Sequence, residues 1–476
     1  MNRLFINGNW VDAKKGEHFD VLNPATEEVI ASLPLAEAED CVVAIEAAAK
    51  AFHSWKKTTP YERAGILKNA ADHIRKNILQ LASDMVRESG KPLAEAKGEW
   101  AVAANLFEWY AEEGKRAYGK LIPANRIDKR ISVIWQPMGV IGVITAWNFP
   151  AYNPARAWAA ALAAGCTVVA KPSEHTPLSA FHMVNALTAS GLPAGVLNLV
   201  MGDAAAIGDA MLRHSQLKKI SFTGSTRVGK ILMDGASLTH TRLSLELGGN
   251  APVLIFDDVE VEAMAKAAAA ARFRNNGQVC IAPQRFYIHK NIFDAFATAV
   301  TRHVAALKMG NGFEEGVQVG PLITKAQRDS VVELLSQTEK ENARILTGGK
   351  TPAGMPKGYF IEPAVVAGLT PGSILAKQEI FGPVLPLFSF DDFEDGIRKA
   401  NSTEYGLAAY VFTRDINTAI HAAEQLEFGM VGINEWAPHG TEAPFGGWKY
   451  SGQGHESGSE GMYEYMEKKL ISIGGL

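Results

Sequence analysis

After Met138, short apolar segments alternate regularly with stretches of helical periodicity, and this pattern leaves few folds open to the chain. The apolar segments are GVIGVITAW, TVVAKP, VLNLV, KKISF and RLSLEL, which we interpret as five strands with four connections. Each connection is long enough for a helix, and strands joined in this way run parallel with right-handed crossovers. The pattern therefore predicts a doubly wound α/β sheet whose carboxyl edge forms a crevice for a nucleotide.

A second alternation follows the first and predicts a second α/β domain. It begins at APVLIF, passes through a helix from about Glu260 to Arg274, and continues through RFYIH, YFIEPAVV, VLPLFSF, YVFTR and VGIN. A chain of 476 residues also exceeds the usual size of one hydrophobic core. The part before Met138 is helix-rich, with helical patterns over Glu37–Trp55, Tyr61–Glu88 and Ala94–Glu113.

Two segments with strand character lack a crossover helix: Arg126–Gln136 and the terminal KKLISIGGL. Such strands can pair in a subunit interface. The glycine-rich stretch 446–461 is predicted to be a loop. We expect residues 1–118 and 138–249 to form a dinucleotide-binding domain, 250–449 a catalytic domain, and 119–137 with 450–476 a small oligomerisation element.

Composition excludes several classes of function. The net charge of −4 offers no basic excess for nucleic acid. Cys41, Cys166 and Cys280 are too widely and irregularly spaced for a disulfide framework or a zinc site, which predicts a reducing, cytoplasmic compartment. No signal peptide or long apolar run is visible, so no membrane association is expected.

Cys280 ends the stretch RFRNNGQVC, where the Asn-Asn-Gly turn breaks the preceding helix and should place the thiol on a loop. A single cysteine is more often a small buried hydrophobic residue, and this remains our interpretation of Cys41 and Cys166.

The surroundings of Cys280 resemble a known family. RFRNNGQVC is similar to the nucleophile segment of the aldehyde dehydrogenase superfamily, LELGGNAP to its glutamate motif and AWNFP to its asparagine motif. Further matches, in the family's order, are VVAKPSEHTPLSA, SFTGSTRVG, QEIFGPV and PFGGWKYSG. The resemblance covers essentially the whole chain and implies an α/β fold of the aldehyde dehydrogenase type.

The resemblance assigns catalytic roles that the chemistry of the side chains supports. Cys280 would attack the aldehyde carbon as a thiolate and carry the acyl group as a thioester. Asn148 and the backbone N–H of Cys280 would donate to the oxyanion, and Glu246 would activate the deacylating water. Taken alone, Asn148 could be a turn residue and Glu246 a solvated carboxylate at a strand end.

Cofactor residues follow from the resemblance in the same way, and no metal is implied. The expected set is Trp147, Lys171, Glu174, Gly224, Ser225, Glu379 and Phe381. Glu174 would accept hydrogen bonds from ribose hydroxyls and repel a 2′-phosphate, which favours NAD, with NADP as the alternative. Glu174 could instead be a helix-start charge near Thr176 and Pro177.

Arg156 and Arg274 resemble the carboxylate-binding arginines of succinate semialdehyde dehydrogenases, which implies an anionic substrate. The family's arginine-lysine pair is replaced here by Arg156 and Ala157. Other segments are similar to 2-oxoglutarate semialdehyde dehydrogenases, and a phosphonate or sulfonate would also suit two arginines. An arginine at a helix end often pairs with a surface carboxylate, and this alternative stays open above all for Arg274.

The expected function is thus NAD-dependent oxidation of an aldehyde, such as succinate semialdehyde, by a homodimer or homotetramer. Open alternatives are a broad-range enzyme for neutral aldehydes, a CoA-acylating dehydrogenase, and an inactive structural protein with the same fold. GSTRVGK is a near miss for a phosphate loop, but Ile231 stands where a magnesium-binding hydroxyl is needed.

Overall fold

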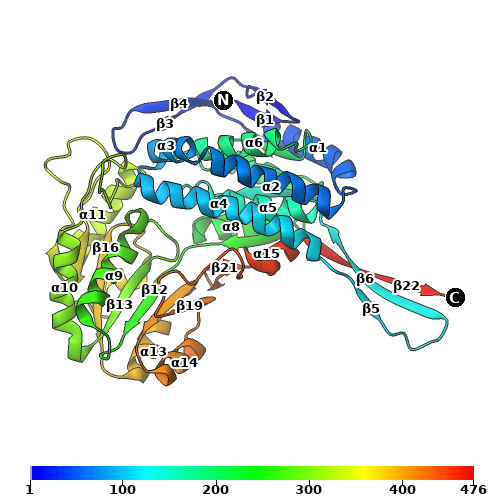
Figure 1. The fold of residues 1–476 in the computed structure, drawn as a ribbon. Coiled ribbons are helices and arrows are strands. Elements are labelled where there is room, and N and C mark those ends of the chain that lie inside the picture. Colours follow the sequence, from blue (N-terminus) through cyan, green and yellow to red (C-terminus); the bar gives the residue numbers. More distant parts are fainter. Residues whose placement is uncertain (1–2, 476) are drawn as a thin grey trace.

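The computed structural model describes residues 3–475 and contains two large sheets flanked by helices (Figure 1). The first sheet has the order β2-β1-β9-β8-β7-β10-β11-β21. Its parallel strands are β7 (Val140–Ile144), β8 (Thr167–Lys171), β9 (Leu197–Leu199), β10 (Leu217–Thr223) and β11 (Arg242–Glu246). Chain order reverses at β7, which pairs with both β8 and β10, so the predicted doubly wound topology is confirmed.

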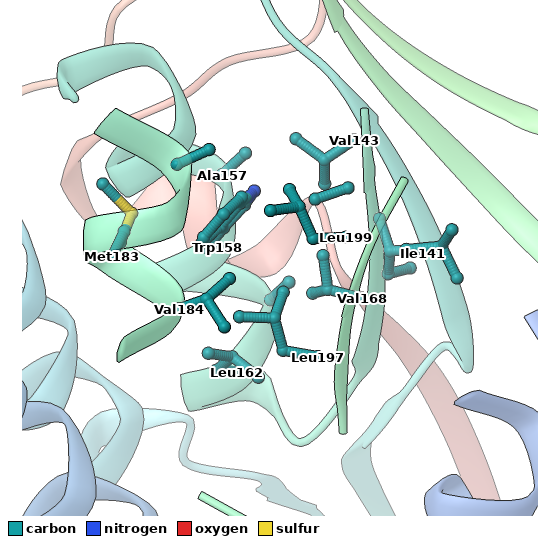
Figure 2. Close-up of a cluster of buried hydrophobic side chains, with 14 of the residues drawn as sticks. Ile141, Val143, Ala157, Trp158, Leu162, Val168, Met183, Val184, Leu197 and Leu199 are labelled. Atoms are coloured by element: carbon teal, nitrogen blue, oxygen red, sulfur yellow. The ribbon is translucent and has the colours of Figure 1, made fainter. Parts of the chain in front are cut away.

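Helices cover both faces of this sheet. The crossovers are α5 (Tyr152–Ala164), α6 (Leu178–Ala189), α7 (Ala204–Arg213) and α8 (Thr226–Ser237). Figure 2 shows Trp158 of α5 and Val184 of α6 packed beside Val168, Leu197 and Leu199 of the sheet. The strands carry apolar side chains on both faces, as expected for a sheet buried on both sides.

The amino-terminal helices pack around this sheet, the first of them directly against its strands and the others against the crossover helices α5 and α6. They are α1 (Ala38–Trp55), α2 (Pro60–Lys76), α3 (Ile78–Ser89), α4 (Leu93–Glu113) and the short η1 (Gly114–Arg116). The single helix predicted over Tyr61–Glu88 is wrong, because the chain leaves helical geometry at Asn77 (φ −108°, ψ 12°). The Asn77 amide donates to the carbonyl of His73 at 2.8 Å, which competes with the continuation of the helix.

The prediction that the part before Met138 is rich in helices did not include four strands that precede α1. These are β1 (Leu4–Ile6), β2 (Asn9–Val11), β3 (His18–Leu22) and β4 (Val29–Pro34). They are short, and β1 joins the edge of the first sheet beside β9.

The second sheet has the order β14-β15-β16-β13-β12-β18-β19 and confirms the second α/β alternation. Its strands are β12 (Ala251–Ile255), β13 (Pro283–His289), β14 (Arg344–Thr347), β15 (Ala364–Ala367), β16 (Val384–Phe390), β18 (Ala408–Phe412) and β19 (Met430–Ile433). Its helices are α9 (Val261–Phe273), η2 (Arg274–Gly277), η3 (Lys290–Ile292), α10 (Phe293–Ala305), α11 (Lys325–Lys340), α12 (Ile374–Lys377), α13 (Phe393–Asn401) and α14 (Ile416–Gln425). The strand predicted over YFIEPAVV is shorter than expected, because β15 begins only at Ala364.

A third, antiparallel sheet projects from the body as an arm (Figure 1). It has the order β22-β6-β5, with β5 (Lys120–Ile122), β6 (Lys129–Pro137) and β22 (Met466–Gly474). The predicted strand character of both segments is confirmed, and they pair with each other from Lys129 to Pro137 and from Met466 to Gly474.

The glycine-rich stretch 446–461 is more structured than the predicted loop. It contains β20 (Trp448–Lys449), β21 (Gly452–Gln453) and the start of α15 (Gly458–Tyr463). β20 pairs with β17 (Tyr405–Gly406), while β21 extends the first sheet beside β11. The segment therefore pairs with the first large sheet and with β17, which lies just before β18 of the second sheet in the chain. No helix within residues 3–475 has the length and apolar character needed to cross a membrane.

Candidate active site

Cys280 lies on a loop between α9 and β13, as predicted, and an unusual turn brings it there. Asn275, Asn276 and Gly277 all adopt left-handed backbone conformations, with φ of 46°, 56° and 71°. Such angles are costly for residues other than glycine and occur where the surroundings enforce them. At Gly277 a side chain would collide with the carbonyl oxygen of Gly382, so the turn requires glycine.

Hydrogen bonds from the surroundings hold this turn. The Asn275 backbone N–H donates to Glu95 Oε2 at 2.9 Å, and the Asn275 amide donates to the Asn148 carbonyl at 2.8 Å. The Asn276 amide donates to the carbonyl of Gly320 at 2.9 Å. These three hydrogen bonds to groups outside the turn hold the stretch that precedes Cys280 in place.

Asn148 follows β7 and reaches the Cys280 loop from the first sheet. Its Nδ2 donates to the carbonyl of Gln278 at 3.1 Å, while its Oδ1 accepts from Asn153 at 3.2 Å. One amide hydrogen of Asn148 remains for a further acceptor, since an amide nitrogen carries two. A role in the local turn, the alternative left open for Asn148, does not explain why its buried side chain donates to Gln278 of the Cys280 loop.

Helix α4 supports both loops through residues that the sequence analysis missed. Glu99 accepts from the backbone N–H groups of Ala151 and Tyr152 at 2.8 and 3.1 Å and so caps the start of α5. Lys91, just before α4, donates to Glu99 and, at 2.9 Å, to the Asn148 carbonyl. The one sequence signal is the spacing of Glu95 and Glu99, which places two carboxylates on one helix face.

Cys280 borders a cavity of about 300 Å³ between the two large sheets. The structure brings the two predicted substrate arginines to this cavity together with the thiol. The lining residues are Lys91, Glu95, Gly98, Glu99, Val102, Phe149, Tyr152, Asn153, Arg156, Arg274, Val279, Cys280, Ile281, His439 and Phe445.

The two arginines differ in their partners. Arg156 is 1% exposed and forms an ion pair with Glu456, which also accepts from the Ser221 hydroxyl at 3.0 Å. Its guanidinium lies 4.2 Å from the ring centre of Phe445. Within residues 3–475 no ion pair is recorded for Arg274, whose guanidinium lies 5.7 Å from the Phe149 ring centre. Arg156 therefore pairs with a buried carboxylate, whereas the surface ion pair considered for Arg274 is absent within the described residues.

Burial dominates the electrostatics of the reactive groups. Burial raises the pKa of the Cys280 thiol to about 12, and the charge of Arg156 opposes this shift. Glu246 ends β11 and is buried, and desolvation raises its pKa well above the ordinary value. Among the described residues Glu246 Oε2 has no hydrogen-bond partner. A buried, unpartnered carboxylate is costly and is typical of functional sites rather than of a solvated strand end.

The glycines after Glu246 allow close approach of the loops around the site. A side chain at Gly249 would collide with the Cys280 carbonyl oxygen, and one at Gly248 would lie 2.6 Å from Glu379 Oε2. Glu379 accepts from the Gly249 backbone N–H at 3.0 Å, and burial raises its pKa to about 7. Glu379, a predicted cofactor residue, is thus hydrogen-bonded to Gly249, and Gly249 packs against the backbone of Cys280.

Other predicted cofactor residues lie along the carboxyl edge of the first sheet. Lys171, at the end of β8, donates to Glu174 Oε2 at 2.9 Å. Glu88, and not Glu174, accepts from the first backbone N–H groups of α6, at Leu178 and Ser179. The helix-start role considered for Glu174 is therefore filled by Glu88.

Gly224 and Ser225 follow the end of β10, whereas Trp147 follows β7 and Phe381 precedes β16 of the second sheet. Ser225 caps α8, accepting from the Val228 backbone N–H at 3.3 Å, and Gly224 precedes it. A helix start of this kind favours an anion. The rings of Trp147 and Phe381 meet edge to face at 5.4 Å. Within the described residues no group of three or more His, Cys, Asp or Glu is placed to hold a metal ion.

A doubly wound sheet, a second α/β unit and a thiol that borders a cavity are the arrangement expected for the family that the sequence resembles. The model of the aldehyde dehydrogenase family matches residues 10–471, and the chain belongs to that family. The predicted family, fold and oxidation of aldehydes are thereby confirmed.

The similarity to curated relatives extends over the whole chain. A mitochondrial succinate-semialdehyde dehydrogenase from Oryza sativa subsp. japonica is 44% identical, over 99% of this chain and 89% of the relative. A glutarate-semialdehyde dehydrogenase from Pseudomonas putida is 44% identical, over 99% and 97%. A 3-sulfolactaldehyde dehydrogenase from Pseudomonas putida is 42% identical, over 100% and 97%.

Solved structures agree closely with the fold. An NADP-dependent enzyme from E. coli gives a TM-score of 0.98 at 42% identity, covering 100% of this chain and 98% of the other. A betaine aldehyde dehydrogenase from Staphylococcus aureus in complex with NAD⁺ gives a TM-score of 0.98 at 34% identity, covering 100% and 95%.

Proposed function

We propose that the chain oxidises an aldehyde with an anionic group at its far end to the carboxylic acid, through a thioester on Cys280. The observation that carries this proposal is the presence of Arg156 and Arg274 in the cavity that Cys280 borders. Three relatives named above act, by their names, on succinate semialdehyde, glutarate semialdehyde and 3-sulfolactaldehyde, all of which carry an acidic group.

The chemistry begins at Cys280, whose thiolate adds to the aldehyde carbon. The free amide hydrogen of Asn148 and the backbone N–H of Cys280 are the donors for the resulting oxyanion, and one such donor contributes about 3 kcal/mol in related sites. The nicotinamide cofactor, when bound, accepts the hydride from the former aldehyde carbon. Cys280 then holds the acyl group as a thioester.

Glu246 completes the reaction by taking a proton from the water that attacks the thioester. Burial raises its pKa, so the carboxylate is a strong base once it has lost its proton. This role favours hydrolysis over transfer of the acyl group to CoA.

NAD⁺ is the cofactor we propose, with NADP⁺ as the alternative. Glu174 is free of the helix-capping role and partly exposed, so its carboxylate can accept from ribose hydroxyls and disfavours a 2′-phosphate. Lys171 beside it offsets part of that repulsion. Both cofactors occur in the names of similar structures. The remaining cofactor candidates that we propose are Trp147, Gly224, Ser225, Glu379 and Phe381.

We further propose a homodimer or homotetramer in the cytoplasm, with no nucleic acid or membrane partner. The arm of β5, β6 and β22 exposes apolar side chains, and the free cysteines suit a reducing compartment. The domain division is the one given above, in which 119–137 and 450–476 form the oligomerisation element.

A comparison of kcat/KM for succinate semialdehyde and for hexanal tests the proposed substrate class. Arg274 has no ion pair within residues 3–475, so Arg274→Ala should remove most of an anion preference of about tenfold or more, as expected for a charge-assisted hydrogen bond. Arg156→Ala should act in the same direction. Arg302→Ala, an exposed arginine of α10, is the matched control.

Equal use of hexanal by the wild type, with no effect of the arginine variants, would contradict the proposal. The chain would then be a broad-range dehydrogenase for neutral aldehydes. Absence of any aldehyde oxidation would instead favour the inactive structural protein.

A further inference from the structure

Arg272, in the last turn of α9, is a buried arginine to which the proposed reaction assigns no role. Its side chain is 0% exposed, although a guanidinium group keeps its charge in proteins. A buried charge is costly unless its surroundings compensate it. Within residues 3–475 the charge that opposes the desolvation of Arg272 is that of Glu379.

The guanidinium of Arg272 holds the backbone of a distant segment. Its Nε donates to the carbonyl of Val384 at 2.6 Å, and its Nη2 donates to the carbonyl of Gly382 at 2.7 Å. Both carbonyls belong to residues 378–384, which we call the cofactor loop because this segment carries two of the predicted cofactor residues. Arg272 therefore links the end of α9 to this loop through two parallel hydrogen bonds.

The same side chain borders the turn that precedes Cys280. A side chain at Gly277 would collide with the carbonyl oxygen of Gly382, and its Cβ would lie 3.4 Å from Nη1 of Arg272. Nη1 is shielded from solvent and has no hydrogen-bond partner among the described residues. The turn, the cofactor loop and the guanidinium thus meet at one point.

Two neutral amides complete the attachment of the cofactor loop. Gln284 of β13 exchanges hydrogen bonds of 2.8 and 2.9 Å with the loop backbone, and Gln327 of α11 donates to the carbonyl of Phe381 at 3.0 Å. Phe381 itself has a left-handed backbone, with φ of 47°, which the surroundings must enforce. Among the described residues, Arg272 is the one charged side chain that is hydrogen-bonded to the backbone of this loop.

The charge of Arg272 acts on the carboxyl group of the same loop. Burial raises the pKa of Glu379 to about 7, while the Gly249 N–H and the charge of Arg272 oppose the shift. Burial also lowers the pKa of Arg272 to about 9, so it remains charged near neutral pH. Cys280 and Tyr405, the other described titratable groups that sense Glu379, are neutral there because burial raises their pKa values.

We propose that Arg272 is a positioning residue for hydride transfer, which ties the cofactor loop to the turn that carries Cys280. This inference rests on the proposed function, because it needs a dinucleotide bound beside the thiol. The planar fork of an arginine fixes the direction of the loop as well as its position. The loop then presents Glu379 and Phe381 to the cofactor at a set distance from Cys280, and rates of transfer depend steeply on such distances.

The test uses Arg272→Met, which removes the charge and the donors, and Arg272→Lys, which keeps the charge without the fork. Calorimetric titration of the full-length enzyme with NAD⁺, without aldehyde, gives the cofactor affinity. A single turnover at saturating NAD⁺, with the aldehyde that the wild type oxidises best, gives the rate of hydride transfer. Arg63→Met is the matched control, because Arg63 is also buried and donates to two backbone carbonyls, at 2.9 and 2.6 Å.

Both quantities should change in the Arg272 variants. In Arg272→Met the Kd for NAD⁺ should rise about tenfold, and the single-turnover rate should fall about tenfold or more, because a small misplacement slows transfer. In Arg272→Lys the rate should fall as well, since a point donor cannot hold both carbonyls. Arg63→Met should change neither quantity.

The pH dependence of NAD⁺ affinity separates the charge of Arg272 from its packing. An ionised carboxylate is the stronger hydrogen-bond acceptor, so the affinity of the wild type should rise as Glu379 loses its proton near pH 7. Without the charge of Arg272 the pKa of Glu379 is higher, so in Arg272→Met this rise should move up by about one pH unit. In Arg272→Lys it should stay at the pH of the wild type.

The outcomes separate this inference from the proposed function. A wild-type rate at saturating NAD⁺ in both Arg272 variants would overturn the role of Arg272 and leave the proposed function standing. Equal losses in Arg63→Met and Arg272→Met would also overturn it, because they would show a general loss of packing. If Arg272→Met does not fold, a wild-type rate in Arg272→Lys is enough to overturn the inference. A wild type that binds neither NAD⁺ nor NADP⁺ overturns the proposed function itself.

Discussion

At the scale of single residues, the site is built from charged and polar groups that are withdrawn from water. Glu246 and Cys280 both have raised pKa values because burial disfavours their charged forms, and Arg156 opposes the shift at each of them. Arg156 is itself neutralised by Glu456. Burial thus favours the neutral form of both reactive groups.

Substitution of Glu246 should separate the two halves of the reaction. Glu246→Gln retains the shape of the side chain but cannot act as a base, so a first burst of NADH should remain while steady turnover falls by about 10²–10³-fold. Because the Glu246 pKa is raised, the wild-type kcat should rise as the pH increases through the range in which the carboxyl group loses its proton. Stopped-flow and steady-state absorbance of NADH measure both quantities.

Glu394→Gln, an exposed carboxylate on α13, is the control and should keep both phases. Steady turnover of Glu246→Gln at the wild-type rate would remove Glu246 from the mechanism.

The catalytic candidates could be predicted because each lies in a local motif, whereas their partners could not. The motifs around Cys280, Asn148 and Glu246 are short and appear in the order expected for the family. Arg156 and Glu456, which form an ion pair, are 300 residues apart in the sequence. Their pairing depends on the position of the connection between β21 and α15, which carries Glu456. Periodicity and composition carry no information about such a contact.

At the scale of secondary structure, the elements that position the site are α4 and the segment from 445 to 457. The carboxylate of Glu99 on α4 is almost fully buried, accepts from two backbone groups of α5, and is paired with Lys91. Removal of one member of a buried pair leaves the other charge uncompensated.

The variant Glu99→Ala should therefore lower the free energy of unfolding by about 3 kcal/mol. Denaturant unfolding followed by circular dichroism measures the change. Glu108→Ala on the same helix removes a carboxylate that is 51% exposed and should cost less than about 1 kcal/mol. A Glu99→Ala protein as stable as Glu108→Ala would show that α4 does not hold the site in this way.

The sequence predicted the parallel strands and their crossovers well, because buried parallel strands are continuous apolar runs. It failed where short-range polar contacts decide the structure. Asn77 ends α2 through its own side chain, and the glycines of 446–461 permit close pairing with β11 and β17 where an open loop was expected. Such choices depend on neighbours that periodicity does not reveal.

At the scale of the whole molecule, the arm of β5, β6 and β22 lacks a covering layer within the described chain (Figure 1). Its exposed apolar side chains include Leu121, Ile127, Leu470 and Ile473. An extended apolar strand left in water is a site of association.

Leu470→Asp should therefore weaken the oligomer and reduce the molar mass measured by light scattering after size-exclusion chromatography. Ile416→Asp on α14 is the matched control, because the two side chains are exposed to 66% and 65%. An unchanged mass for Leu470→Asp, or a monomeric wild type, would contradict an assembly through the arm.

The account depends above all on the thioester at Cys280, and single-turnover release of NADH tests it most directly. Wild-type enzyme mixed with NAD⁺ and excess succinate semialdehyde should release about one NADH per site in a rapid burst, and Cys166→Ala, which removes a buried thiol, should do the same. Cys280→Ala should give no burst, because hydride transfer needs the covalent adduct. An undiminished burst in Cys280→Ala would contradict the central claim.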